Sequence, residues 1–127
     1  MHNAAADASG PVSELTAEDL LSVLRIETAG LITALQAVLP RLRTQHTGTV
    51  LATSRQGRLG GSAIEDVVHR LAGELKPEGI HVATVAVSPG VPQELVAGAF
   101  TDLVSETAQD PATWRAAVEL GIPKNLP

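Results

Sequence analysis

The segment that begins at Ser54 carries the residue types best suited to bind or transform a ligand. It reads Ser-Arg-Gln-Gly-Arg-Leu-Gly-Gly, so one hydroxyl and two guanidinium groups stand among three glycines. The β-branched run at 49–53 predicts a buried strand before it, and α/β sheets bind ligands at the carboxyl ends of their strands. Such a turn, followed by a helix N-terminus, can hold an anion. The alternative is a shortened connection whose glycines serve only a tight turn. Neither G-x-x-x-x-G-K-S/T nor G-x-G-x-x-G occurs, so nucleotide binding is not predicted.

Two further candidates depend on carboxylates. Glu27 lies within a long apolar segment, where a buried carboxylate can act as a general acid or base. Its alternatives are an ion pair with Arg25, a contact with a partner chain, or a position at a wet edge. Glu65 and His69 are four residues apart on one helix face, which is half of a metal site or an acid–base pair. No third ligand stands nearby, so a solvated helix face is the preferred interpretation and no metal site is expected.

The composition restricts the classes of protein to which the chain can belong. The 127 residues predict a single domain over 1–127, with a flexible lead-in at 1–12 and a loose tail at 120–127. Aromatic residues are 2% of the chain and tyrosine is absent, so the core must be aliphatic. A net charge of −5 without a basic stripe argues against nucleic acid as a partner. No apolar run reaches about 18 residues, so neither a membrane span nor membrane binding is expected, and the cytoplasm is the expected compartment.

The hydrophobic pattern predicts alternating helices and strands. Thr16 with Asp19 three residues later indicates a capped helix start, and continuation of that helix through Pro40 is an alternative to an end at residue 39. Ser62 with Glu65 reads as a second capping box, and Asp110 before Pro111 as a third helix start. The remaining histidines, His81 among them, read as ordinary surface or strand-end residues. Helices are expected at 17–39, 62–75, 93–106 and 111–119, and strands at 49–53 and 80–87. This order predicts an α/β fold with a parallel sheet and a right-handed crossover.

Five stretches, in this order, are similar to segments of a known family. They are His2-Asn3-Ala4-Ala5, residues 11–39 with the ending Leu39-Pro40, residues 53–57, residues 71–82 and Ser88-Pro89-Gly90. Over about residues 2–90 the chain therefore resembles the C-terminal half of the short-chain dehydrogenases/reductases. The resemblance implies a partial Rossmann-like three-layer unit with a short parallel sheet and a long interface helix.

The resemblance also assigns candidate site residues. Ser54 matches the family's catalytic serine, and Glu27 stands where the family has a catalytic asparagine. The family's Tyr-x-x-x-Lys pair falls on Gly57 and Gly61, and the family's dinucleotide-binding loop belongs to a region before the first residue of this chain. Because the tyrosine is the family's proton donor, the resemblance implies no unaided hydride transfer and no cofactor. Ser54, Glu27 and Arg55 are the predicted site residues.

Three hypotheses about function follow. The first is a non-redox relative that acts as an assembly or accessory subunit, forming a homodimer or hetero-oligomer through helices 17–39 and 62–75. The second is a cofactor-independent enzyme, an isomerase, dehydratase or cyclase, with a small apolar substrate as its ligand. The third is an oxidoreductase subunit that a partner chain completes. One scaffold hosts many activities, so the fold alone does not choose between them.

Overall fold

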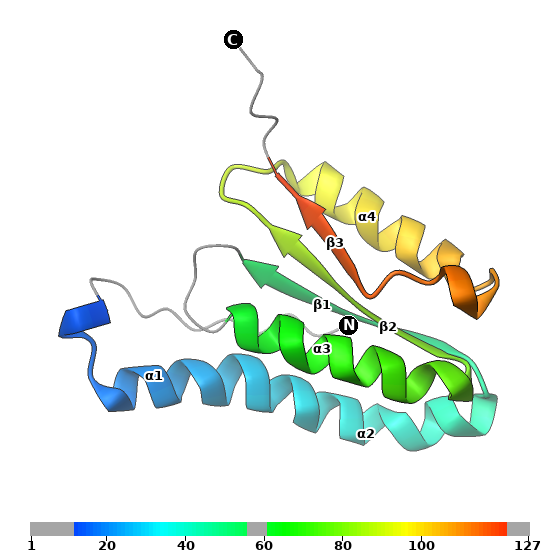
Figure 1. Cartoon of the computed structure of the whole chain (residues 1–127), viewed down its shortest axis with the longest axis horizontal. Coiled ribbons are helices and arrows are strands. Elements are labelled where there is room, and N and C mark those ends of the chain that lie inside the picture. The colour runs from blue at the N-terminus through cyan, green and yellow to red at the C-terminus, as the bar shows by residue number, and fades with distance from the viewer. Residues whose placement is uncertain (1–11, 56–60, 122–127) are drawn as a thin grey trace, which may run out of the picture.

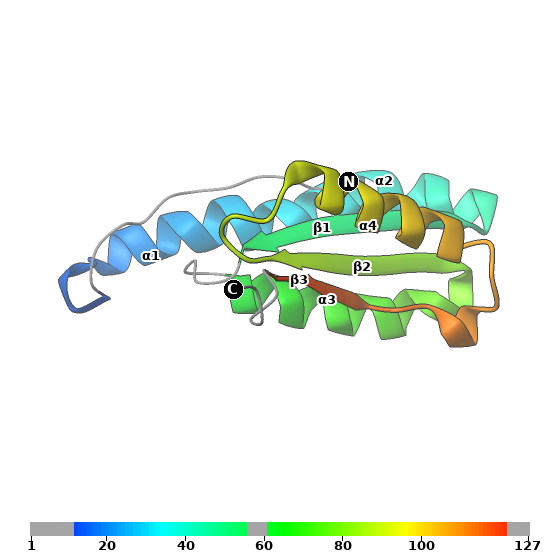
Figure 2. The ribbon, with the colours of Figure 1, turned by 90° about the horizontal axis from the view of Figure 1, so that it is seen from above.

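The computed structural model describes residues 12–55 and 61–121, which form three layers around a parallel sheet (Figure 1). The strands lie in the order β1-β2-β3, and each neighbouring pair is parallel. The helices that precede β1 and link β1 to β2 cover one face, and the helix after β2 covers the other (Figure 2). The predicted α/β class with a parallel sheet is therefore confirmed.

The first two strands agree with the sequence pattern, and the third was not predicted. β1 is Gly48–Arg55 and β2 is Ile80–Val87, and they pair in register from Gly48 opposite Ile80. The helix expected at 111–119 is wrong. Only Pro111–Thr113 forms a 3-10 turn, capped by Asp110, and Ala117–Leu120 then forms β3 beside β2. Ala, Glu and Leu favour a helix locally, but the backbone of β2 offers hydrogen bonds that a strand at this position satisfies.

One continuous helical rod precedes the sheet. It consists of α1 (Ala17–Leu24), a π-helical turn (Arg25–Ala29) and α2 (Gly30–Gln45). The capping box at Thr16 is confirmed. The Thr16 side chain accepts a hydrogen bond from the backbone amide of Asp19, and the Asp19 carboxylate accepts one from the backbone amide of Thr16. The helix end expected at residue 39 is wrong, and the alternative of continuation through Pro40 is confirmed. The helix ends where His46 adopts a left-handed conformation.

The π-turn keeps one side of this rod on the core. Its buried positions recur every four residues, at Val23, Glu27, Leu31 and Leu35. A regular α-helix has 3.6 residues per turn, so each four-residue step rotates the buried side by about 40°. A wider turn at Arg25–Ala29 counteracts that drift. The rod therefore presents Val23 and Leu35 in the same general direction although three helical turns separate them.

Two apolar clusters, one on each face of the sheet, hold the layers together. On the first face, α2 and α3 (Gly61–Leu75) pack on β1 and β2. On the other face, α4 (Gln93–Glu106) packs on all three strands. Members of the first cluster include Leu31, Leu35, Val50, Ile64, Val68, Leu75, Ile80 and Val82, and members of the second include Leu51, Ala83, Val85, Ala99 and Leu103. The strands are buried on both faces, as expected for a parallel sheet.

Most of the expected lead-in and tail lies outside the residues that the structure describes. Residues 1–11 and 122–127, which hold most of the expected lead-in and tail, are not among the described residues. Val12 opens a short 3-10 turn, Val12–Glu14, and Leu120 belongs to β3. A single domain over the whole chain stays a prediction.

Candidate functional site

Ser54 lies buried near the carboxyl end of β1 and has a carboxylate partner. Only 2% of the residue is exposed, and its Oγ donates a hydrogen bond to Glu65 Oε1 at 2.9 Å. Glu65 stands near the start of α3, which packs on the same face of the sheet. The second capping box is therefore wrong: α3 begins at Gly61, before the expected cap Ser62, and Glu65 binds the Ser54 hydroxyl. The sequence pattern placed Glu65 on the solvent side of its helix and did not predict this pair.

The backbone around Ser54 is closely packed at the head of α3. A side chain at Gly61 would begin 3.1 Å from the carbonyl oxygen of Arg55, which is closer than ordinary van der Waals contact. Arg55 ends β1 with an exposed side chain. The rest of the expected glycine-rich turn, including Gly57, lies outside the described residues. A side chain at Gly61 would therefore require the Arg55 carbonyl to move by a few tenths of an ångström.

Glu27 lies on the same side of the sheet as Ser54. It is buried within the π-turn, and this turn contacts α3, the helix that carries Glu65. π-turns inside α-helices are frequent at functional sites. The structure thus joins Ser54 to Glu65 directly and brings the segment of Glu27 against the same helix, whereas the Arg55 side chain faces solvent.

A metal site is not formed by Glu65 and His69. No group of three or more His, Cys, Asp or Glu side chains with metal-binding geometry occurs in residues 12–55 and 61–121. Four ligands are usual for structural zinc and three for catalytic zinc. The interpretation of the pair as a solvated helix face holds for His69, which is exposed, and is wrong for Glu65, which is half-buried and accepts from Ser54.

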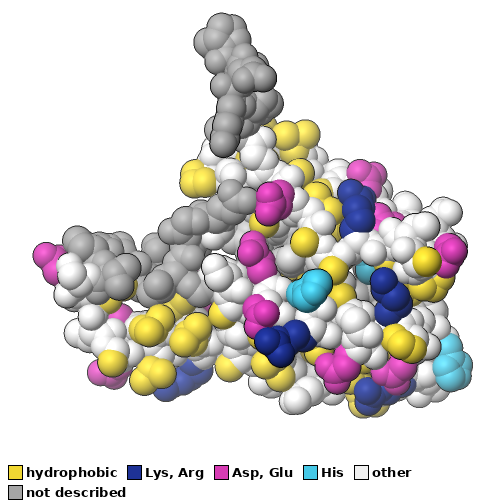
Figure 3. Space-filling model, viewed as in Figure 1, with side chains coloured by type: hydrophobic (Ala, Val, Ile, Leu, Met, Phe, Trp, Pro, Cys, Tyr) yellow, Lys and Arg dark blue, Asp and Glu magenta, His cyan; other side chains and the backbone are white. Residues whose placement is uncertain are grey.

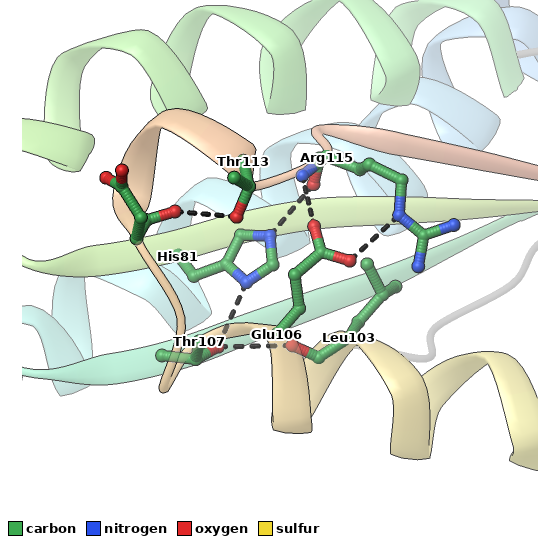
Figure 4. A network of polar contacts seen from close by, with 7 residues as sticks. His81, Leu103, Glu106, Thr107, Thr113 and Arg115 are labelled. Carbon is green, nitrogen blue, oxygen red and sulfur yellow. Dashed lines mark hydrogen bonds and ion pairs between the residues drawn. The ribbon is translucent and has the colours of Figure 1, made fainter.

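A second polar network, centred on His81, was missed by the sequence pattern (Figure 4). The expectation that His81 is an ordinary strand-end residue is wrong, because it is almost fully buried. Its Nε2 lies 2.8 Å from the carbonyl oxygen of Arg115, and its Nδ1 lies 2.9 Å from Thr107 Oγ1. Thr107 Oγ1 is also 2.6 Å from Thr49 Oγ1. Since a carbonyl only accepts, Nε2 carries a proton, and the network links the start of β1, the end of α4 and the segment before β3.

Glu106 and Arg115 form an ion pair at the edge of this network. The Arg115 side-chain Nε donates to Glu106 Oε2 at 2.8 Å, and the Arg115 backbone amide donates to Glu106 Oε1. Burial alone would raise the pKa of Glu106. The two hydrogen bonds and the positive charge of Arg115, with a smaller contribution from His81, outweigh burial and hold the pKa below its ordinary value.

The three-layer fold, with polar residues at the carboxyl end of a parallel strand, defines a Rossmann-like α/β protein. No protein-family model matches the chain. Human 17-beta-hydroxysteroid dehydrogenase type 1 is 31% identical over 98 residues, which are 68% of this chain and 30% of the human protein. The chain therefore belongs to the short-chain dehydrogenase/reductase family, as the sequence motifs implied.

Solved structures with the same fold include several dehydrogenases. A short-chain dehydrogenase from Rhodopseudomonas palustris has a TM-score of 0.78 at 22% identity, covering 95% of this chain and 60% of that protein. Serine dehydrogenase from Escherichia coli has a TM-score of 0.75 at 16% identity, covering 93% and 60%. At these identities the likeness shows the fold alone. The chain spans 30% of the length of the human relative and 60% of each of these two structures.

Proposed function

We propose that this chain is a non-redox short-chain dehydrogenase-like protein that acts as an assembly or accessory subunit. Hydride transfer in the family needs a tyrosine as its proton donor. No tyrosine is present in the 127 residues, and the positions of the family's tyrosine and lysine correspond to Gly57 and Gly61. At Gly61 the neighbouring Arg55 carbonyl leaves little space for a side chain. The Ser54 hydroxyl, in turn, is engaged by Glu65. Without a positioned acid, the proton-transfer contribution of about 10²–10⁴-fold is lost.

The observation that carries the assembly role is the apolar surface of the helical rod. Seven large hydrophobic side chains are exposed in the described part of the chain, and five of them lie on this rod. Figure 3 shows hydrophobic side chains gathered over α1, at the lower left of the molecule. An exposed apolar cluster such as the one over α1 is typical of sites that bind another protein. The five are Leu20, Leu21, Ile26, Ile32 and Val38.

The same rod is long and apolar enough to cross a membrane by length and composition. The sequence pattern had not indicated a span there. Leu31 and Leu35 of this rod, however, lie in the core against β1 and α3. Because one face of the rod is packed on the sheet, we favour a protein partner over a bilayer for its exposed face. The cytoplasm stays the proposed compartment.

Sedimentation velocity at micromolar concentration tests the assembly role. We expect a homodimer or a larger species. Leu21→Glu places a charge in its interface and should raise the dissociation constant by roughly tenfold or more. Leu21 is 56% exposed, so the substitution leaves the core untouched. Leu95→Glu on α4, where Leu95 is 54% exposed, is the matched control and should sediment like the unmodified chain. A clean monomer, or equal effects of both substitutions, would contradict the proposal.

A cofactor-independent enzyme is the second candidate, and the buried Ser54–Glu65 hydrogen bond favours it. A carboxylate that accepts from a hydroxyl can remove its proton, which is how nucleophiles are activated. Ser54, Glu65, Glu27 and Arg55 are the residues to substitute if a small apolar substrate is found.

A subunit completed by a partner chain is the third candidate, and the outer edge of β1 favours it. Within the described residues β1 pairs only with β2, so its other edge offers backbone hydrogen bonds. Pockets of about 250 Å³ and 430 Å³ adjoin β1, one beside α2 and one beside α4. Such an edge can accept a further strand from another chain.

A further inference from the structure

The partly buried hydroxyl of Thr107 has more polar neighbours than its single hydrogen can serve. Its Oγ1 lies 2.9 Å from His81 Nδ1 and 3.2 Å from the carbonyl oxygen of Leu103 (Figure 4). It also lies 2.6 Å from Thr49 Oγ1. A hydroxyl donates one hydrogen bond and accepts two, so the position of this hydrogen depends on what His81 offers. Nothing in the proposed function uses this network.

The neutral and the protonated ring of His81 require different positions of the Thr107 hydrogen. Nε2 donates to the carbonyl oxygen of Arg115 in both states, because a carbonyl only accepts. In the neutral ring Nδ1 carries no hydrogen, so Thr107 donates to Nδ1. In the protonated ring Nδ1 donates to Thr107, and the Thr107 hydrogen turns to the carbonyl oxygen of Leu103. Thr49 can donate to Thr107 in either state.

Both states therefore satisfy the buried polar groups without any movement of heavy atoms. The Leu103 carbonyl also accepts from the backbone amide of Thr107, so it has a partner even when the hydroxyl turns away. Only the protonated ring, however, uses the contacts to Thr49, Leu103 and His81 at the same time. A buried histidine usually favours unfolding when it takes up a proton. This network instead provides an acceptor for the added hydrogen within the folded protein.

The charges around His81 come from three elements. At the end of α4, the attraction between His81 and Glu106 contributes to the lowered pKa of Glu106, and the same attraction favours a protonated ring. Arg115, before β3, is paired with Glu106. His69 on α3 and Lys76 just after it line the same pocket as His81, and both oppose a further positive charge. The neighbouring residues of β1 carry no charge. Burial also opposes the charge, whereas hydrogen bonds from an ionised donor are about twice as strong as neutral ones.

We propose that His81 is a pH-sensitive switch built into the fold. It takes up a proton in the folded protein, and Thr107 accommodates that proton by turning its own hydrogen from His81 to Leu103. The bond from Nε2 to the Arg115 carbonyl then becomes charge-assisted and stronger. Because Arg115 lies just before β3, a fall in pH holds the start of this strand more firmly against β2.

Trp114 reports the charge of His81. The two rings stack with centroids 4.9 Å apart and planes 19° apart, and Trp114 is the single tryptophan of a chain without tyrosine. An imidazolium quenches the emission of an indole in contact with it much more than a neutral imidazole does. Trp114 emission should therefore fall to a plateau between about pH 8 and about pH 5, while the far-ultraviolet circular dichroism stays constant. Constant emission, or an emission change that accompanies loss of helix, would overturn the proposal.

Two histidine substitutions identify the group that titrates. His81→Gln keeps a donor for the Arg115 carbonyl but takes up no proton, so its emission should not change over this pH range. His69 lines the same pocket as Trp114, and His69→Gln is the matched control that should keep the full response. Persistence of the response in His81→Gln, or its loss in His69→Gln, would refute the assignment to His81.

Two threonine substitutions test the part played by the hydroxyl. Thr107→Val removes the acceptor for Nδ1, so the midpoint of the emission change should move to lower pH by about one unit. Thr101→Val is the matched control on α4, because the Thr101 hydroxyl also donates to the carbonyl four residues earlier, that of Ala97. Its midpoint should equal that of the unmodified chain. Equal midpoints for both variants would show that Thr107 does not accommodate the proton.

Nitrogen-15 spectra of the unmodified chain test the switch without any substitution. At about pH 8, only Nε2 of His81 should carry a hydrogen, because Nδ1 accepts from Thr107. At about pH 5, both ring nitrogens should carry one. A ring that still has a single hydrogen at the lower pH, or that carries its hydrogen on Nδ1 at the higher pH, would contradict the proposal.

Discussion

At the scale of single residues, the Glu106–Arg115 pair sets how the end of α4 responds to pH. The carboxylate accepts from both the backbone and the side chain of Arg115, and these contacts lower its pKa. A group with a lowered pKa in the folded state adds stability above its unfolded pKa. That stability is lost as the pH falls through the folded pKa.

Glu106→Gln should therefore destabilise the protein at neutral pH and matter less in acid. We expect a loss of about 1 kcal/mol at pH 7, because a charged acceptor is replaced by a neutral one. The difference from the unmodified chain should shrink as the pH falls from the ordinary pKa of a glutamate towards the lowered pKa of Glu106 in the folded state. Urea unfolding across this pH range measures it. A constant difference at all pH values would contradict the assigned role.

The sequence predicted some site residues but not their partners. Ser54 was expected at the carboxyl end of a strand because a β-branched run ends there, and the structure places it so. Its contact with Glu65 depends on the angle at which α3 returns across the sheet, and local periodicity does not encode that angle. His81 was missed for a similar reason. Its burial arises only when Thr107 and Trp114, far along the chain, fold against it.

At the scale of elements, Gly79 fixes the turn between α3 and β2. Its φ is +80°, in the left-handed region, and a side chain there would collide with the backbone carbonyl of His46. Only glycine adopts this conformation without strain, and the contact also aligns the start of β2 with the end of α2.

Gly79→Ala should lower stability by about 1–3 kcal/mol from the backbone conformation, and further from the collision. Gly73→Ala is the matched substitution within α3. It meets open space in a helix and should raise stability by up to about 1 kcal/mol. The midpoint of urea unfolding measures both. Equal shifts for the two variants would show that the turn does not have the role given to it here.

Long elements with a regular pattern were predicted best. The strand at 80–87 and the helix at 93–106 were predicted with the bounds that the structure shows. β3 was missed because its four residues, Ala-Val-Glu-Leu, have no strand periodicity of their own and pair only because β2 offers an open edge. The rod was predicted too short because Pro40 usually ends a helix, whereas here the helix continues to Gln45.

At the scale of the whole molecule, the chain belongs to the short-chain dehydrogenase/reductase family, and the proposed function is without hydride transfer. We therefore expect that a titration with NADH or NADPH, monitored by the fluorescence of the nicotinamide, shows no saturable binding. The 3-oxoacyl-[acyl-carrier protein] reductase from Brucella melitensis, whose crystal structure contains NAD, is the positive control. Saturable binding of either cofactor to this chain would contradict the non-redox proposal and favour the oxidoreductase hypothesis.

The π-turn determines where the helical rod can tolerate a change of length. Five residues of a π-turn rotate the chain about as far as four residues of a regular α-helix. Deleting one residue between Arg25 and Ala29 would therefore make the turn regular while Leu31 and Leu35 keep facing the sheet. The same deletion inside the regular part of α2 would rotate one half of the rod against the other by about 100°. A shortening within the π-turn should thus be tolerated better than a shortening a few residues further along.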